Sequence, residues 1–317
     1  MQQVNLYPFV RSIASYVLPA KLLKRPGSGG TFSSKYCYTV WLRHLVLLSK
    51  SGLLKDVSKI KKIAEIGPGD SLGVGIAGLL TGAEEYYAFD VIEHANRERN
   101  IQIASELTGY FKERMDLPHK EHEFRNTHPL LDDYSFPSYI FDDSSTIETL
   151  EKREQGIKMA LSDEESETKI EYVPHWYEKE SNLQGELDLI YSQAVMEHVD
   201  DVSHAYSRMY DWLKPGGIIS HEIDFKTHEM TKEWNGHWYI DKRTWKFLLN
   251  GRKYSINRLP FSAHLIEMEK AGFVIKYVLP FQMENAFGDR LPKVPNVNFT
   301  KEDMTIASAL IQAVKPD

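Results

Sequence analysis

The sequence predicts an α/β protein with a mainly parallel sheet and helices on both faces. Short apolar runs of strand length alternate with segments of helical spacing along most of the chain. Glycine or glycine-proline turns follow several of these runs, as they do between strands and helices. The chain has 317 residues, 42% of them hydrophobic, which suffices for one large domain with elaborations or two small domains.

Each element follows from its local pattern. The predicted strands are residues 62–66, 85–92, 169–174, 187–193 and 218–224, with a closing pair at 273–280 and 305–314. The predicted helices are residues 36–54, 74–82, 96–115, 203–213 and 262–272. These elements predict two parts, an N-terminal helical extension over residues 1–59 and a main domain over residues 60–317.

One segment interrupts the alternation. Residues 116–168 are acidic and contain no strand pattern, and a stretch of this length without strands is unusual inside a compact domain. We interpret it as an insertion, partly helical over residues 146–161 and otherwise loop. It is either a decorated surface loop or a lid or wall beside a substrate.

Composition and charge exclude several classes of protein. The net charge is −7 and no basic stripe is visible, so we expect no nucleic-acid partner. The single cysteine, Cys37, allows no internal disulfide and favours a reducing, cytoplasmic compartment. The apolar run at residues 4–23 is interrupted by Pro8, Arg11 and Pro19, so we expect no membrane span. It either packs on the main domain or contacts a membrane peripherally.

The stretch IAEIGPGDSLGVG indicates a ligand-binding turn between a strand and a helix. Gly67 and Gly69 allow a sharp bend and close approach of a ligand. Leu72 stands where the dinucleotide fingerprint needs its third glycine, and no P-loop lysine follows, so a pyrophosphate is not favoured. Glu65 would attract a cation, and Asp90 at the end of the next strand can accept ribose hydroxyls. These features match S-adenosylmethionine, with NAD or no ligand as alternatives.

Four motifs in order resemble class I S-adenosylmethionine-dependent methyltransferases: EIGPGDSLG, FDVI, LDLIYSQAVMEHVDD and WLKPGGIISHEID. The resemblance implies a Rossmann-like sheet of seven strands whose last strand is antiparallel, and S-adenosylmethionine as cofactor. It departs from the family pattern at Ser71, where a third glycine is common, and after the third strand, where an acid that contacts adenine is missing. The cofactor-binding residues that it implies are Glu65, Gly67, Pro68, Gly69, Asp70, Ser71, Leu72, Asp90, Val91, Ser192, Gln193 and Ala194.

Methyl transfer to an alcohol is helped by a general base near the reacting carbon. The candidates are Asp224 at the end of the fifth strand, His198 after the fourth strand, and His237 in the following loop. Glu222 is the second choice of carboxylate, and His221 is expected to be buried by strand alternation. Residues 221, 222 and 224 form no recognisable ligand set, so no metal is predicted.

The loop at residues 226–245 gathers aromatic and amide side chains after the expected active-site strand. Trp234, Asn235 and Trp238 offer flat apolar faces and hydrogen bonds, a mixture that suits a sugar ring. The alternative is a capping loop packed on the core. Arg258 could pair with a phosphate or carboxylate on the substrate.

The favoured function is S-adenosylmethionine-dependent O-methylation of a sugar or glycan hydroxyl. The alternatives are N- or carboxyl-methylation of a small metabolite, and a non-catalytic scaffold that binds a partner through the acidic insertion. The expected partner is a small-molecule or glycan acceptor, and the sequence does not indicate an oligomeric state.

Overall fold

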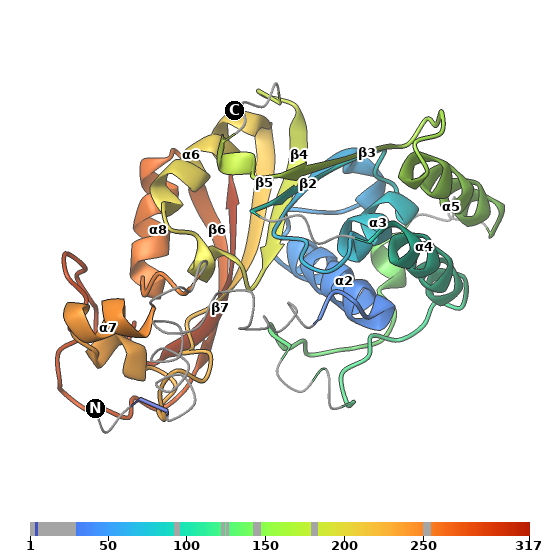
Figure 1. Cartoon of the computed structure of the whole chain (residues 1–317). Helices are drawn as coiled ribbons and strands as arrows, with labels where there is room; N and C mark the ends of the chain where they lie inside the picture. The colour runs from blue at the N-terminus through green and yellow to red at the C-terminus, as the bar shows by residue number, and fades with distance from the viewer. Residues whose placement is uncertain are drawn as a thin grey trace.

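A computed structural model gives the fold (Figure 1). It describes residues 4–5, 30–91, 96–121, 124, 127–141, 147–178, 183–249 and 255–317. Their strands form a seven-stranded sheet in the order β3-β2-β1-β4-β5-β7-β6. The strand order reverses between β1 and β4, which is where ligands bind in open parallel sheets.

Six of the strands run in the same direction, and the seventh lies antiparallel between two of them at one side of the sheet. The strands are β1 (Lys62–Ile66), β2 (Glu85–Asp90), β3 (Lys169–Pro174), β4 (Leu187–Gln193), β5 (Leu213–Asp224), β6 (Val274–Gln282) and β7 (Ile306–Val314). Strand β7 runs antiparallel to both β5 and β6. The predicted fold class is therefore confirmed. Strand β5 starts earlier than predicted, because the proline-glycine stretch after α6 is included in it.

Helices cover both faces of the sheet (Figure 1). The longer ones are α2 (Ser34–Lys50), α3 (Gly73–Leu80), α4 (Arg97–Lys112), α5 (Ile147–Leu161), α6 (Val202–Trp212), α7 (Lys242–Leu248) and α8 (Phe261–Lys270). Neighbouring helices among α2 to α5 pack on one face, and α6 packs with α8 on the other. Each face buries its own hydrophobic cluster, as the two-sided burial of a parallel sheet requires.

Helix α2 belongs to the segment predicted as an N-terminal extension, and it is deeply buried. Its N-cap Ser33 accepts a hydrogen bond from the backbone N–H of Tyr36, and its inner face enters the cluster on α3 and α4. The Trp41 indole N–H donates to the Thr81 hydroxyl at 2.8 Å, and His44 Nδ1 lies 2.8 Å from the Ser220 hydroxyl. The helix is thus tied directly to the sheet layer.

The insertion contributes one helix and a segment that reaches the sheet. Helix α5, predicted at residues 146–161, packs on α3 and α4. The buried Arg43 guanidinium on α2 donates to the carbonyl oxygens of Thr127 and Pro129. Gln193 at the end of β4 donates to the carbonyl oxygen of His128 at 2.9 Å. Part of the insertion therefore lies beside the carboxyl end of β4.

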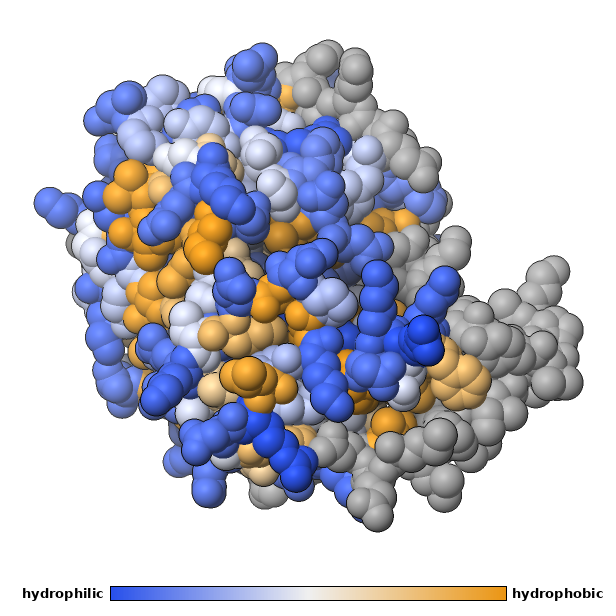
Figure 2. Space-filling model, turned by 90° about the vertical axis from the view of Figure 1, so that its left-hand side faces the viewer, coloured by the Kyte–Doolittle hydropathy of each residue, from blue (hydrophilic) through white to orange (hydrophobic). Residues whose placement is uncertain are grey.

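The N-terminal leader at residues 4–23 lies outside the described residues except for its first two positions. Val4 forms an antiparallel bridge with Thr231, and the Asn5 amide donates to the Glu229 and Thr231 carbonyl oxygens. No helix in the described ranges is long and apolar enough to cross a membrane. The side of the molecule with α7 and α8 shows apolar patches separated by polar groups (Figure 2).

Candidate functional site

A cavity of about 210 Å³ lies at the carboxyl ends of β1, β2 and β4. Parallel strands present these ends at one edge, so residues distant in sequence meet there. Its sides are closed by Val195 and Val199, which flank η6 (Met196–His198), and by the aromatic rings of η5 (Trp176–Glu178). The lining residues are Ile66, Gly67, Phe89, Asp90, Val91, Trp176, Tyr177, Val195, His198, Val199, Asp200 and Asp201.

The glycine turn is held in the left-handed conformation that glycine favours. Gly67 and Gly69 both have φ of 73°. A Cβ on Gly67 would lie 2.6 Å from a methyl group of Val195, so the turn packs against the loop after β4 without room for a side chain. Gly67 lines the cavity, and its lack of a side chain brings the backbone to the ligand space.

The remaining residues of the turn fix its shape from within. Pro68 is buried, and the backbone N–H of Asp70 donates to the Thr31 hydroxyl at 2.9 Å. Ser71 is fully buried and donates to the Thr31 carbonyl oxygen, and the Leu72 N–H donates to the Asn100 side-chain oxygen at 2.9 Å. These contacts tie the turn to the start of α2 and to α4.

Asp90 ends β2 and lines the cavity, as the sequence predicted from its position. Its Oδ2 accepts the backbone N–H of Gly69 at 3.3 Å, and its Oδ1 accepts the N–H of Val91 at 2.6 Å. The carboxylate therefore braces the turn and reaches the ligand space at the same time. A ribose diol is a suitable partner for an acid in this place.

Glu65 has a different environment from the one that the sequence suggested. It is 3% exposed, and its Oε2 accepts the hydroxyls of Tyr86 at 2.6 Å and Tyr191 at 3.2 Å. It is not among the described residues that line the cavity. Burial raises the pKa of Glu65 to about 7, against the lowering effect of the two tyrosine hydroxyls. The side chain connects β1, β2 and β4 beneath the turn.

The end of β4 is shaped by its neighbour β5. Ser192 is fully buried and its hydroxyl lies 2.7 Å from Nδ1 of His221, which is also fully buried as predicted. The amide of Gln193 donates to Glu222 Oε2 at 3.1 Å. Ala194 has φ of 51°, a strained value for an L-residue, and turns the chain toward η6.

Of the three predicted bases, His198 is the one that lines the cavity. Asp224 is close behind it at the end of β5, where its Oδ1 lies 3.0 Å from Lys226 Nζ and its Oδ2 3.5 Å from His228 Nε2. Burial raises the pKa of Asp224, but the hydrogen bond from His228 and the charge of Lys226 outweigh it and lower the pKa below its usual range. An ionised carboxylate held this way is a weak proton acceptor at neutral pH.

His237 lies in η7 (Gly236–Tyr239) and is 2% exposed. Burial, followed by the charge of Arg258, lowers the pKa of His237 well below its usual value. Its ring packs 4.9 Å from that of Trp238. The structure thus places His237 in the interior of the loop, away from the cavity lining.

The predicted substrate residues form a packed subdomain. Asn235 and Trp238 are fully buried, and the Asn235 amide donates to Asn285 Oδ1 at 3.0 Å. The Trp234 indole N–H donates to the Glu284 carbonyl oxygen at 2.8 Å. Arg258 is buried with its guanidinium 4.7 Å from the Trp245 ring. These contacts match the alternative that we gave for the loop, a cap packed on the core.

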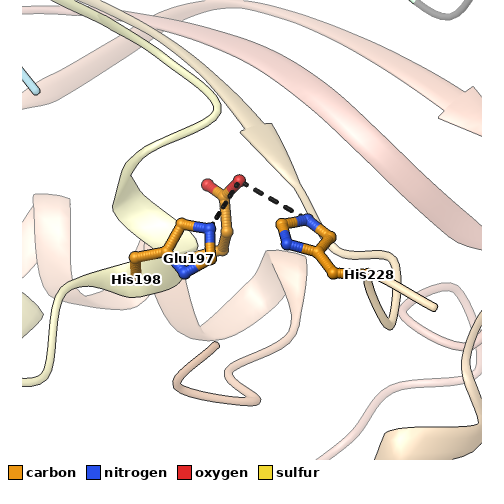
Figure 3. A group of neighbouring side chains, drawn as sticks. All are labelled: Glu197, His198 and His228. Carbon is orange, nitrogen blue, oxygen red and sulfur yellow. Dashed lines mark ion pairs between the residues drawn. The ribbon is translucent and has the colours of Figure 1, made fainter. Parts of the chain in front are cut away.

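Sequence reasoning missed two residues near His198. Glu197 and His228 come from the loops after β4 and β5, and the structure brings their side chains together (Figure 3). Glu197 is 3% exposed, and burial, followed by the charges of Asp224 and Glu222, raises its pKa well above the usual value. The available signal was position, because both residues follow neighbouring strands at the ligand-binding edge.

The fold and the braced glycine turn define a Rossmann-like protein with a cavity at the switch point of the sheet. A family model described as a methyltransferase domain matches residues 82–274, more than half of the chain. The chain therefore belongs to this methyltransferase family. Comparison with curated proteins gives no match.

Solved structures of methyltransferases are similar to the chain at low identity. Phosphoethanolamine N-methyltransferase 2 from Haemonchus contortus is 13% identical with a TM-score of 0.43, over 87% of this chain and 53% of that chain. The chain thus spans about half the length of that enzyme. A Mesorhizobium loti S-adenosylmethionine-dependent methyltransferase is 15% identical with a TM-score of 0.42, over 85% and 97% of the two chains. A Methanosarcina mazei enzyme of the same description is 15% identical with a TM-score of 0.40, over 83% and 93%.

Proposed function

We propose that this chain is an S-adenosylmethionine-dependent methyltransferase that methylates an oxygen acceptor, with a sugar or glycan hydroxyl as the acceptor class. One observation carries the proposal: a single cavity is bordered by the Gly67 backbone, the Asp90 carboxylate and the His198 imidazole. The first two suit the cofactor, and the third suits an acceptor that must lose a proton.

The residues fit the cofactor. A ribose diol can bind the Asp90 carboxylate, and the ring of Tyr177 supplies an aromatic wall for adenine. When bound, S-adenosylmethionine supplies a methyl group activated by a sulfonium. The chain's own task is then to align the acceptor, exclude water and accept a proton.

His198 is the proposed proton acceptor because it reaches the cavity from the loop after β4. Asp224 is proposed to act through charge rather than as a base, since Lys226 and His228 keep it ionised. The sugar class is kept from the sequence prediction; of the three loop residues behind it, Trp234 is half-buried, whereas Asn235 and Trp238 are buried in the cap. A cytoplasmic location without a nucleic-acid partner is part of the same proposal, in agreement with the single, free cysteine.

A second candidate is methylation of an amine. Asp224, which Lys226 and His228 keep ionised, can attract a positively charged group of such an acceptor, whereas burial raises the pKa of Glu197 and of Glu222 and favours their neutral forms. A nitrogen nucleophile needs less help from a base, so transfer to an amine would tolerate His198→Asn. Transfer to a hydroxyl would fall by a factor of roughly 10²–10⁴, the usual contribution of a general base.

The cofactor site is tested by calorimetric titration of the full chain with S-adenosylmethionine and with S-adenosylhomocysteine. We expect one site per chain, and Asp90→Asn should weaken it by roughly 10- to 100-fold, the equivalent of one charge-assisted hydrogen bond. Asp211→Asn, an exposed change on α6, is the matched control and should bind as the wild type does. Absence of heat with either ligand from folded protein would overturn the proposal.

A further inference from the structure

Glu197, His198 and His228 form a compact group at the edge of the cavity (Figure 3). One ligand atom from each lies within 4.8 Å of the others. Glu197 Oε1 is 4.0 Å from His198 Nε2 and 3.9 Å from His228 Nε2. The first two residues come from η6 after β4, and the third from the loop after β5, so the group bridges two neighbouring strand ends.

Within the described part of the chain, the carboxyl group of Glu197 is buried with only the two long histidine contacts as partners. Its side chain is 4% exposed, and neither oxygen has a hydrogen-bond partner of good geometry among the described residues. A buried carboxylate without partners costs several kcal/mol. Native proteins avoid this cost by pairing the group, by coordinating a metal ion, or by keeping it protonated.

The position of His228 is also specified by the fold. His228 and Glu229 are consecutive non-glycine residues with φ of 50° and 62°, a sparsely populated conformation for both. The Asn5 side-chain amide donates to the Glu229 carbonyl oxygen and so holds this turn. The strained turn directs the imidazole of His228 toward Glu197 and Asp224.

We propose that Glu197, His198 and His228 bind one divalent transition-metal ion. Two imidazole nitrogens and one carboxylate are the protein ligands of open zinc sites and of other first-row metal sites that keep positions free for a substrate. Ligand atoms roughly 2.0–2.1 Å from a common ion lie roughly 3.4 Å apart in a tetrahedral site. The two Glu197 contacts must therefore shorten by about half an ångström, and the two imidazole nitrogens, which lie within 4.8 Å of each other, by up to about 1.4 Å. The prediction that no metal binds was based on residues 221, 222 and 224 and did not include these three residues.

The surroundings favour a cation. Asp224 Oδ2 lies 3.5 Å from His228 Nε2 and adds a second carboxylate beside the group, and Lys226 partly offsets it. His198 belongs both to this group and to the cavity lining, so an ion here would sit at the acceptor side. There it would bind an oxygen of the acceptor and lower the pKa of a hydroxyl, and because it occupies the His198 nitrogen it would take the place of His198 as the group that activates the hydroxyl. This role rests on the proposed function, whereas metal binding itself does not.

The test uses the full chain after chelator treatment and dialysis. MnCl₂ is titrated with detection of free Mn²⁺ by electron paramagnetic resonance, and ZnCl₂ by calorimetry, both without cofactor. We expect one ion per chain. Glu197→Gln keeps the shape and His228→Asn tolerates the left-handed backbone, and each should weaken binding at least tenfold. His204→Asn, which removes an exposed histidine on α6, should leave affinity unchanged.

Two results would overturn the metal site: no saturable one-to-one binding of either ion by the wild type, or wild-type affinity in both variants. Circular dichroism establishes that the variants are folded, and the loop variant His228→Asn serves if Glu197→Gln does not fold. If Glu197 is instead buried in its protonated form and binds no metal, the experiment gives the first of these results. Loss of the metal site would leave binding of S-adenosylmethionine intact, so this failure is distinct from failure of the proposed function.

Discussion

Replacing Glu65 by glutamine should remove a pH-dependent part of the free energy of unfolding. Glu65 is buried beneath the glycine turn and accepts hydroxyl hydrogen bonds from Tyr86 and Tyr191. Burial is the dominant influence and raises the pKa of Glu65 from 4.5 to about 7 in the folded chain. Glutamine has nearly the same shape, keeps an acceptor oxygen and cannot ionise.

The sign follows from the two pKa values. The folded chain holds the proton of Glu65 more tightly than the unfolded chain, so its stabilising contribution is complete below pH 4.5 and is lost as pH rises through about 7. The difference between 4.5 and about 7 corresponds to about 3 kcal/mol, at 1.36 kcal/mol per pH unit. The wild type should lose about this much more stability than Glu65→Gln between pH 4.5 and pH 8.

The measurement is urea unfolding at several pH values between 4.5 and 8, for the wild type, Glu65→Gln and the exposed control Glu113→Gln. We expect the control to follow the wild type. The affinity of Glu65→Gln for S-adenosylmethionine should stay within about twofold, because the side chain does not line the cavity. Parallel stability curves for all three proteins would refute the reasoning. A large loss of cofactor affinity with unchanged stability would instead indicate that Glu65 contacts the cofactor directly, as the sequence predicted.

Two further changes probe the supports of the site. Gly67→Ala introduces a Cβ 2.6 Å from a Val195 methyl group at φ of 73°, whereas Gly52→Ala has φ of 76° and open space. Both variants should lose about 1–2 kcal/mol of unfolding free energy to backbone strain. Gly67→Ala alone should also lose cofactor affinity in the calorimetric titration. Equal cofactor affinities of the two variants would contradict the close packing of Gly67 on Val195. Arg43→Met leaves the carbonyl oxygens of residues 127 and 129 unpaired and should cost about 1–3 kcal/mol. In this variant, amide hydrogen exchange should become faster over residues 127–131, while the amides of β7 stay protected. Unchanged exchange over residues 127–131 would show that Arg43 does not hold this segment in place.

The sheet and the cofactor turn could be predicted because their signals are local. Strand and helix periods are visible in single segments, and the spacing from the glycine turn to Asp90 is set by one strand-helix-strand unit. The beginning of β5 was missed because Pro215 and Gly216 indicate a turn, while the structure includes them in the strand. The pairing with β4 passes from Leu213 to Ile218 through an irregularity, and Gly216 there has φ of 74°, so the strand includes a local turn.

The acceptor side could not be predicted because it depends on contacts between distant segments. Trp238 looked available for a ligand, but its ring packs 5.3 Å from that of Phe299, which comes from the segment between β6 and β7. His228 shows no helical or strand period, and its direction follows from a left-handed turn that no propensity specifies for histidine. Its meeting with Glu197 requires that β4 and β5 be neighbours in parallel.

The residues of the first two motifs divide into two physical roles. Glu65, Ser71 and Leu72 point inward and hold the turn through Tyr86, Thr31 and Asn100, while Gly67 and Asp90 face the cavity. A change in the first set alters the free energy of unfolding and reaches the ligand only through the shape of the turn. A change at Asp90 removes a ligand contact from a turn that the other supports still hold. Comparing Glu65→Gln with Asp90→Asn therefore separates support from contact, because the first should change stability and the second affinity.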